Sequence, residues 1–506
     1  MLSRSSARNY DRTGKSTQQI ATDLGVDYVL EGSVRWQRRS DGDSQVRVSP
    51  VLVHAPQDVQ VWAESYDRDM SEIFAIQTEI ASAVATQIGA AIAPSQDAQP
   101  DGAPTRDMEA YHLFLRARQA IDKGQLLLDE WSVARTLLIN ALEKDPTYAV
   151  AWAYLARVEA GFCHFNWDRS EERLGAARRA AARARELTPG SADEHLAHGY
   201  VYYWGEKRFA EATREFEAAL ALRPADVETM EALGFVARRE GNYEKALQWL
   251  ERAAGASPSD WRLAFNMSET LLILRRYEEA LLMADRAVKF DPGAPAGYSQ
   301  RAQVLANMGR VHQALEAVDE FPRETTTTSN FTAHMALAML DTDVGMAAAA
   351  RTADYEPEQF RDISGLLNRA YMQWLKDGRE AAQPAFQRAI ESLRSVVAEK
   401  SQESNPASLL AEALAAAGDC DEAIAMAKSA LDLYPANRDM WVRETRTWDL
   451  GRVLLLCGRT QEAQALLRAL CERPGSSVSR EFLRAAPLYQ RHSPIPQFAV
   501  VADFEL

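Results

Sequence analysis

A spacing of thirty-four residues recurs through the middle of the chain and constrains its fold more than any other feature. Alanines and prolines both keep this spacing. They are Ala212, Ala246, Ala280 and Ala314, and Pro224, Pro258 and Pro292. Because two residue types share one phase, the spacing predicts a stack of helical units, each of which hides its apolar face against its neighbours.

One unit can be read in full between Met230 and Pro258. Its small and large positions are Met230, Leu233, Gly234, Ala237, Gly241, Tyr243, Ala246, Leu250, Ala253 and Pro258. Alanine and glycine let the two helices of a hairpin approach closely, and proline ends the second helix. The pattern resembles the tetratricopeptide repeat, in which one unit is a pair of antiparallel helices. The resemblance implies a mainly α fold, a right-handed α-solenoid over residues 107–474.

Degenerate copies of the unit extend the array in both directions. Trp152, Ala177 and Pro189 fit an earlier copy, whereas Leu410, Gly418, Ala423 and Pro435 fit a later one. The phase is lost between Phe321 and Ser364, where we expect a loop over residues 325–330. Residues 475–506 are predicted to form a C-terminal tail.

The first ninety or so residues alternate between strand-like and helix-like periods. This alternation predicts a small α/β domain over residues 1–93. The expected elements are a helix over 16–24, strands over 28–35, 46–53 and 59–66, and a long helix over 70–92. Residues 94–106 are rich in proline, glycine and alanine, so we predict a linker there.

Four segments of this domain are similar to the TolB-like, FlgO-related α/β domain. They are Ser3 to Ala7, Ile20 to Val34, Val46 to Val48, and Val61 to Asp69. In bacteria that domain commonly precedes tetratricopeptide repeats in signalling proteins. Its upstream partner is often a class III nucleotide cyclase, a Ser/Thr kinase or a winged-helix DNA-binding domain. The end of the chain, around Arg484 and Phe498, also resembles the short tail of such proteins.

The resemblance departs from the family at the start of the chain. The family's domain has a further strand and helix before the segment at Ser3, whereas this chain begins at Met1. We therefore expect a truncated domain and an effector that is absent or separate. A sheet without its first strand has an exposed edge, which invites self-association through strand pairing.

Composition narrows the classes of partner and compartment. The net charge of −15 repels polyphosphate and argues against nucleic acid as the direct ligand. The sequence has no run of eighteen apolar residues and no signal-peptide pattern, so we expect a cytoplasmic protein without membrane insertion, or a periplasmic one if an anchor lies upstream. The four cysteines form no Cys-x-x-Cys pair and are expected to be small buried side chains. They are Cys163, Cys420, Cys457 and Cys471.

Two short patterns resemble chemical sites without completing them. Arg12 to Thr17 contains the Gly-Lys-Ser end of a phosphate-binding loop, but Asn9 stands where that motif needs glycine. His195 and His198 can share a helix face, but no third metal ligand is evident nearby in the sequence. With no catalytic motif elsewhere, we expect no catalytic residue, no metal and no cofactor, and hence a protein that is not an enzyme.

A stack of helix hairpins leaves a concave surface lined by the first helix of each unit, where ligands of such folds generally lie. The repeat phase places eight candidate partner-binding residues on that surface. They are Phe235, Arg238, Arg239, Arg262, Phe265, Asn266, Gln300 and Gln303. Arginine and amide groups can hold a peptide carboxylate or backbone, and phenylalanine supplies apolar contact. For any one of them, an ordinary solvated side chain is the alternative interpretation.

An aromatic concentration at Tyr202, Tyr203 and Trp204, beside Phe209, is interpreted as hairpin core, with peptide anchors as the alternative. Together these patterns predict a non-catalytic protein–protein interaction scaffold in bacterial signalling, with protein or peptide partners on the concave face. The alternative is the sensor or regulatory half of a nucleotide cyclase, kinase or transcription regulator whose effector domain is absent from this chain.

Overall fold

The computed structural model describes residues 15–24, 26–38, 44–69, 73–88, 105, 107–123, 128–165, 167–321, 326–352, 360–399, 403–435, 438–476 and 478–506. Residues 3–7 of the TolB-like pattern, Asn9 and residues 12–14 of the phosphate-loop pattern, and linker residues 94–104 lie outside this part. The chain divides into two compact units. The first comprises Met1–Ala232 with Ala256–Ser259, and the second comprises Leu233–Gly255 with Asp260–Leu506.

An antiparallel sheet forms the N-terminal part of the first unit, as the alternating periods predict. Strand β2 (Ser44–His54) pairs with β1 (Tyr28–Arg38) along its whole length, and with β3 (Val59–Ala63) and β4 (Tyr66–Asp69) along its two halves. Helices α2 (Thr17–Leu24) and α3 (Ile73–Gln87) flank the strands in sequence. The single strand predicted over residues 59–66 is therefore two strands, because the pairing is interrupted at residues 64 and 65.

The sheet has a small core and an exposed edge strand. Val46, Tyr66 and Ile76 are buried together. Among the described residues, β2 is the strand partner of β1, whose other edge has none. Leu30 and Val34 of β1 are 49% and 54% exposed. An edge that carries exposed apolar side chains is a template for strand pairing.

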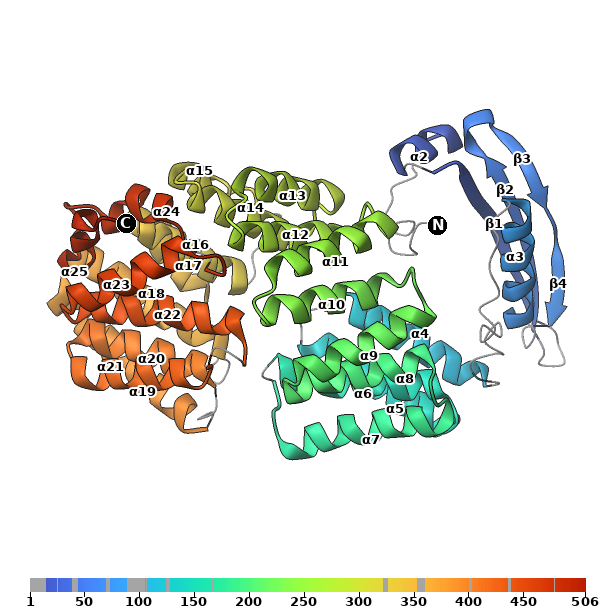
Figure 1. The fold of residues 1–506 in the computed structure, drawn as a ribbon, viewed down its shortest axis with the longest axis horizontal. Helices are drawn as coiled ribbons and strands as arrows, with labels where there is room; N and C mark the ends of the chain where they lie inside the picture. The colour runs from blue at the N-terminus through green and yellow to red at the C-terminus, as the bar shows by residue number, and fades with distance from the viewer. Residues whose placement is uncertain are drawn as a thin grey trace. The chain divides into compact units, whose positions relative to one another are not determined.

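Helix hairpins form the rest of the first unit (Figure 1). They are α4 (Met108–Lys123) with α5 (Leu128–Lys144), α6 (Ala149–His164) with α7 (Glu171–Leu187), and α8 (Ala192–Tyr200) with α9 (Phe209–Leu222). The first helices α6 and α8 also contact each other. Gly161 of α6 packs directly on the Trp131 ring, where a Cβ atom would overlap the ring. Here the close approach joins neighbouring hairpins, because Trp131 belongs to α5.

The aromatic concentration belongs to the core of the first unit, as predicted. Tyr203 and Trp204 are buried in the π-helical segment η3 (Val201–Glu206) between α8 and α9. The Trp204 ring lies 4.4 Å from Tyr200 and 5.9 Å from Trp131, measured between ring centroids. Aromatic pairs at such distances stabilise a core beyond the area that they bury.

The second unit repeats the hairpin from α11 to α23. Helix α10 (Val227–Arg239) crosses the division between the units and contributes Leu233–Arg239 to the second. The following helices are α11 (Tyr243–Ala256), α12 (Trp261–Ile273), α13 (Tyr277–Phe290), α14 (Pro295–Asn307), α15 (Val311–Glu316), α16 (Thr326–Met339), α17 (Thr342–Thr352), α18 (Phe360–Asp377), α19 (Arg379–Glu399), α20 (Ser404–Ala417), α21 (Cys420–Asp432), α22 (Met440–Leu456) and α23 (Thr460–Glu472). Helices α12, α14, α16, α18, α20 and α22 each contact the next, so the first helices form a continuous layer.

The prediction of a loop over residues 325–330 is wrong, because α16 begins at Thr326. Threonine, serine and asparagine are poor helix formers, and their run suggested a break. The helix forms because its later turns bury Ala333, Met335 and Ala336 in the unit. Tertiary packing therefore outweighs local propensity at this position.

The predicted C-terminal tail packs into the second unit. It consists of α24 (Arg480–Ala485), η4 (Pro487–Tyr489), α25 (Pro496–Ala499) and η5 (Val500–Asp503). Leu488, Ile495 and Phe498 are at most 2% exposed and belong to the main core. The Ser479 hydroxyl donates to the carbonyl of Asn307 at 2.7 Å. The tail is thereby fixed against α14, far earlier in the sequence.

The cysteines were predicted only in part. Cys163 and Cys471 are free and buried, as expected. Cys420 and Cys457 instead form a disulfide, with Cα atoms 5.5 Å apart, and both are only half-buried. The disulfide joins the start of α21 to the end of α22, two positions that the repeat brings together across neighbouring hairpins.

The mainly α solenoid with a small N-terminal sheet is thus confirmed. Within the described ranges, every helix is too short or too polar to cross a lipid bilayer.

Candidate functional site

The predicted groove residues lie on the first helices of three successive hairpins. Phe235, Arg238 and Arg239 belong to α10, Arg262, Phe265 and Asn266 to α12, and Gln300 and Gln303 to α14. This placement agrees with the repeat phase. Their surroundings include residues from the C-terminal part of the same chain, which the phase did not predict.

The α10 arginines contact the beginning of α22. The Arg238 side chain is 10% exposed and forms an ion pair of 2.5 Å with Glu269 of α12. Its guanidinium also lies 4.6 Å from the centroid of the Trp441 ring and 5.2 Å from that of Phe235. Arg239 donates to a carboxylate oxygen of Asp439 at 3.3 Å. These arginines are therefore already engaged by other residues of the second unit.

The remaining predicted residues differ in their accessibility. Arg262 is half-buried and paired with Asp260 of its own helix cap at 3.0 Å, and Phe265 is also half-buried. Asn266 is buried, and so is Gln300, which donates to the hydroxyl of Ser268 at 3.2 Å. Gln303 lines a cavity. That these eight residues contact a partner stays a prediction.

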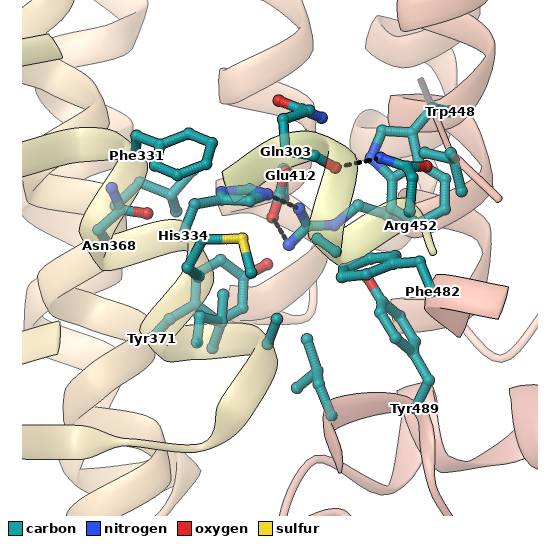
Figure 2. Close-up of a pocket in the computed structure, with 18 of the residues that line it drawn as sticks. Gln303, Phe331, His334, Asn368, Tyr371, Glu412, Trp448, Arg452, Phe482 and Tyr489 are labelled. Carbon is teal, nitrogen blue, oxygen red and sulfur yellow. Dashed lines mark hydrogen bonds and ion pairs between the residues drawn. The ribbon is translucent and has the colours of Figure 1, made fainter. Parts of the chain in front are cut away.

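The cavity has a volume of about 400 Å³ and lies on the layer of first helices. Helices α14, α16, α18, α20 and α22 contribute to its wall, and the C-terminal tail closes one side (Figure 2). Pockets that hold ligands commonly have volumes of this order, with mostly apolar walls and a few polar groups. The cavity escaped the sequence analysis because its wall combines five helices with a tail that follows them.

A buried ion pair crosses this cavity. Arg452 of α22 and Glu412 of α20 lie 2.6 Å apart, with side chains that are 4% and 8% exposed. Arg452 also stacks over the Tyr371 and Phe498 rings, at 6.0 and 5.6 Å from their centroids. The Nε atom of Arg452 is buried and has no hydrogen-bond acceptor among the described residues. Opposite charges cancel here, so the pair adds no net charge to the cavity.

His334 of α16 is a further titratable group in the wall of the cavity. It is exposed, and its Nε2 atom lies 3.4 Å from Nη1 of Arg452. Desolvation by the surrounding protein, together with the Arg452 charge, lowers the pKa of His334 to about 4. The imidazole is therefore neutral at pH 7. Because arginine can only donate, Nε2 accepts and Nδ1 carries the proton.

Aromatic side chains complete the wall. Phe331 comes from α16 and Trp448 from α22, whereas Phe482 and Tyr489 come from the tail (Figure 2). The Tyr489 ring lies 6.2 Å from Trp448 and 6.0 Å from Phe482, between centroids. Burial raises the pKa of Tyr489 to about 12, so its hydroxyl keeps its proton. The cavity is thus aromatic, uncharged overall and supplied with hydrogen-bonding groups.

Comparison with known families agrees with the repeat pattern. Residues 196–260 and 408–477 match the family model of the tetratricopeptide repeat. The matched segments contain α9 to α11 and α21 to α23, together with most of α20. The chain therefore carries tetratricopeptide repeats. The first matched segment includes residues of both units, and the other lies within the second.

Curated relatives cover only parts of the chain. It is 31% identical over 156 residues to the "Putative adenylate cyclase 3" of Rhizobium meliloti, a match that covers 31% of this chain and 25% of that protein. It is 28% identical over 239 residues to the "DnaJ homolog subfamily C member 7 homolog" of Schizosaccharomyces pombe, covering 41% of this chain and 46% of that one. The chain spans less than half the length of these relatives.

Solved structures with similar helices are more distant. Pseudomonas aeruginosa PilF is 19% identical, with a TM-score of 0.34 over 44% of this chain and 96% of that one. YrrB, described as a TPR protein with an unusual peptide-binding site, is 23% identical, with a TM-score of 0.27 over 36% of this chain and 89% of that one. The resemblance of the N-terminal sheet to a TolB-like domain stays a prediction.

Proposed function

We propose that the chain is a non-catalytic interaction scaffold whose second unit binds an extended segment of a partner protein on its concave face. An uncharged, preferably aromatic side chain of that segment is inserted into the cavity. The observation that carries the proposal is the cavity on the first helices, with its paired Arg452 and Glu412 and its neutral His334. Tetratricopeptide repeats suggest protein binding, and the cavity supports the proposal that a partner binds in the second unit.

Charge decides the type of side chain. A charged group entering the cavity would lose its hydration and meet no unpaired opposite charge, because Arg452 and Glu412 already neutralise each other. An apolar or aromatic group loses little hydration free energy on entering the cavity, and it gains contact with Phe331, Trp448 and Phe482. An uncharged polar atom on it can hydrogen-bond to the His334 imidazole. The cavity is therefore suited to a side chain such as tyrosine, phenylalanine or leucine.

The composition of the wall supports a binding role over a catalytic one. The carboxylate of Glu412 in the cavity wall is held in its ion pair with Arg452. Burial raises the pKa values of Tyr371 and Tyr489, so neither hydroxyl is an activated nucleophile. Covalent catalysis needs an activated nucleophile beside a base. A base that protonates only near pH 4 is also a weak proton acceptor at neutral pH. Binding without turnover is the function that these groups support best.

The pathway is proposed from the relatives. The similarity to a protein described as a putative adenylate cyclase favours bacterial signalling, with this chain as a scaffold or, alternatively, as the regulatory part of a larger effector protein.

The exposed edge of β1 offers a second contact, through which two copies could pair. Sedimentation of a Leu30→Lys, Val34→Lys variant tests this, since a self-associating edge predicts a smaller species than the wild type forms.

Selection from a random peptide library displayed on phage tests the proposed site. The full chain is used as bait, beside His334→Glu, which adds an uncompensated carboxylate to the cavity, and His312→Glu, which adds the same charge at an exposed position of α15. We expect enriched peptides to share an uncharged apolar or aromatic residue and to bind the His334→Glu variant at least about tenfold more weakly. Equal binding to all three proteins would place the site elsewhere.

A further inference from the structure

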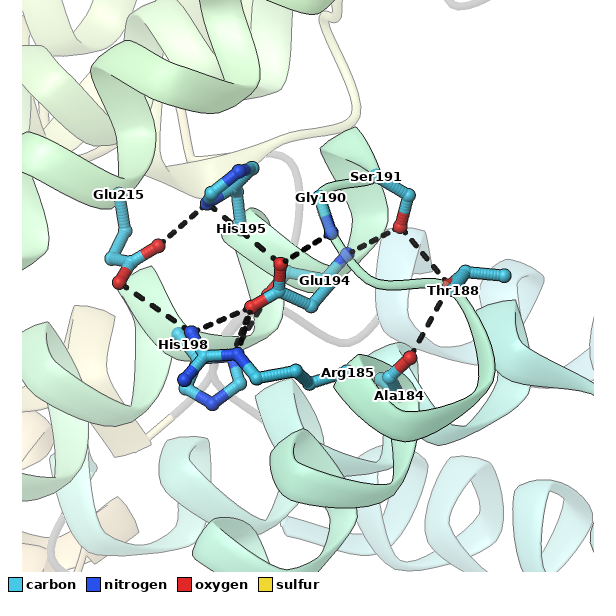
Figure 3. A network of polar contacts seen from close by, with 9 residues as sticks. All are labelled: Ala184, Arg185, Thr188, Gly190, Ser191, Glu194, His195, His198 and Glu215. Atoms are coloured by element: carbon cyan, nitrogen blue, oxygen red, sulfur yellow. Dashed lines mark hydrogen bonds and ion pairs between the residues drawn. The ribbon is translucent and has the colours of Figure 1, made fainter.

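A second cluster of chemically active side chains lies in the first unit, on the hairpin of α8 and α9 (Figure 3). The Nδ1 atom of His195 is 2.7 Å from Oε2 of Glu215 and 4.0 Å from Oε2 of Glu194. Among the described residues, these three form the one group of histidine, cysteine and carboxylate side chains whose potential ligand atoms all lie within 4.8 Å of one another. The groups that complete this cluster around His195 are thus carboxylates, which the sequence analysis did not identify as ligands.

The fold explains why these side chains meet. Ser191 caps α8 by accepting a hydrogen bond from the Glu194 amide, so the first turn of the helix is fixed. Glu194 and His195 follow on that turn, and the antiparallel α9 presents Glu215 opposite them. The site is therefore built on two helices that pack together.

Glu194 is held rigidly. Its side chain is 3% exposed, and Oε2 accepts from the backbone amide of Gly190 at 3.2 Å. His198, one turn later on α8, places its Nδ1 atom 3.0 Å from Oε1 of the same carboxylate. Carboxylates that ligate metals are commonly fixed by such secondary contacts.

One arginine competes for the carboxylates of the cluster. Two carboxylates face one guanidinium, that of Arg185, which lies 2.7 Å from Glu194 and 3.8 Å from Glu215. The Arg185 side chain is 49% exposed, so it can leave the cluster for water at little cost, whereas Glu194 cannot.

The geometry points to a site for a divalent transition metal ion such as zinc, with Glu194, His195 and Glu215 as ligands. Ligands on a tetrahedral zinc ion with bonds near 2.0 Å lie about 3.3 Å apart. The measured separations of 2.7 and 4.0 Å fall on either side of that value. Imidazole and carboxylate are ligands that zinc accepts. On binding, the Nδ1 atom of His195 gives up its contact with Glu215, both atoms turn to the ion, and the ring proton resides on Nε2.

The ion would join α8 to α9 and displace Arg185. It would stabilise the first unit, since any ligand that binds only the folded state raises its stability. The inference is independent of the cavity, which belongs to the other unit.

Titration of the metal-free full chain with zinc, in competition with a chromogenic chelator, tests the site. Cobalt titration serves as a second readout, because its visible absorption reports tetrahedral ligands. We expect one ion per chain and an increase in thermal stability. His195→Ala with Glu215→Gln should weaken binding at least tenfold, whereas Glu217→Gln, which changes an exposed carboxylate of the same helix, should leave it unchanged.

The Arg185→Ala variant separates a metal site from a structural ion-pair network. If the cluster binds metal, removing the competing guanidinium tightens zinc binding. If the cluster is only a network of ion pairs, this variant loses stability and zinc does not restore it. Absence of saturable binding to the wild type, or equal binding to the His195→Ala, Glu215→Gln variant, would overturn the proposal.

Discussion

The guanidinium of Arg238 at the end of α10 lies over the ring of Trp441 at the start of α22. The Cζ atom of Arg238 is 4.6 Å from the ring centroid. Beside them, Arg239 reaches Asp439, whose carboxylate also caps α22. The backbone amide of Gly475 donates to the carbonyl of Ile273 at 3.1 Å. The second unit is therefore an array of hairpins in which early and late helices are tied together. The cavity lies on its layer of first helices.

Arg275 is expected to be one of the residues that maintain this closure. Its guanidinium donates to the carbonyls of Leu470, Arg473 and Val478 at 2.6, 3.1 and 3.3 Å. Removing the donors leaves these carbonyls without that partner, so Arg275→Ala should lower the free energy of unfolding of the second unit by about 1–3 kcal/mol. Urea unfolding measures this, with Lys289→Ala at an exposed position as control. Equal stability of the two variants would mean that the closure contributes little.

Because the ion pair of the cavity is buried, replacing one of its residues should cost more stability than replacing both. Glu412→Ala leaves the Arg452 charge buried without its partner and should cost about 3–5 kcal/mol of stability. Glu412→Leu combined with Arg452→Met removes both charges and should cost much less. Thermal unfolding of the two variants provides the measurement. A double variant as unstable as the single one would show that packing, rather than charge pairing, dominates at this position.

Protonation of His334 should destabilise the protein in mild acid. The ordinary pKa of histidine is 6.5, and that of folded His334 is lowered to about 4. Between these pH values His334 is protonated in the unfolded chain but neutral in the folded chain. The free energy of unfolding therefore falls as the pH decreases from 6.5 to 4. In His334→Gln this part of the pH dependence should be missing. Unfolding curves at several pH values decide the point, and parallel pH profiles for both proteins would contradict it.

The disulfide between Cys420 and Cys457 closes a loop across neighbouring hairpins. Cross-links of this kind stabilise mainly by restricting the unfolded chain, so Cys420→Ser with Cys457→Ser should lose about 2–4 kcal/mol of stability. A reducing agent should lower the melting temperature of the wild type but leave that of the double variant unchanged. If the reducing agent lowers the melting temperature of both proteins equally, its effect does not come from this disulfide.

The sequence predicted the repeating part of the fold because the repeat is local. Its small positions, such as Gly234 and Ala246, mark places where the helices of one hairpin touch, and their spacing is visible without a structure. The same phase placed Phe235, Phe265 and Gln303 on first helices. It failed at Thr326, where tertiary packing makes a helix of a run with low helix propensity.

The candidate site was predicted only in outline. The Trp441 ring packs on the guanidinium of Arg238, and Phe482 and Tyr489 form part of the cavity wall. These three aromatic residues lie about two hundred residues away from the predicted groove in the sequence. Contacts over such separations leave no periodic trace. The pairing of Cys420 with Cys457 and the contact of His195 with Glu215 were missed for another reason, because these pairs are only 37 and 20 residues apart. The repeat phase locates neighbouring helices but does not show which of their side chains meet.

Hydrogen–deuterium exchange of the full chain, with and without a peptide selected by phage display, tests the central claim most directly. Bound peptide should slow exchange in α14, α16, α18, α20 and α22, the helices that line the cavity, and less so in their partners α17, α19, α21 and α23. Protection confined to the partner helices, or to the first unit, would contradict binding on the concave face.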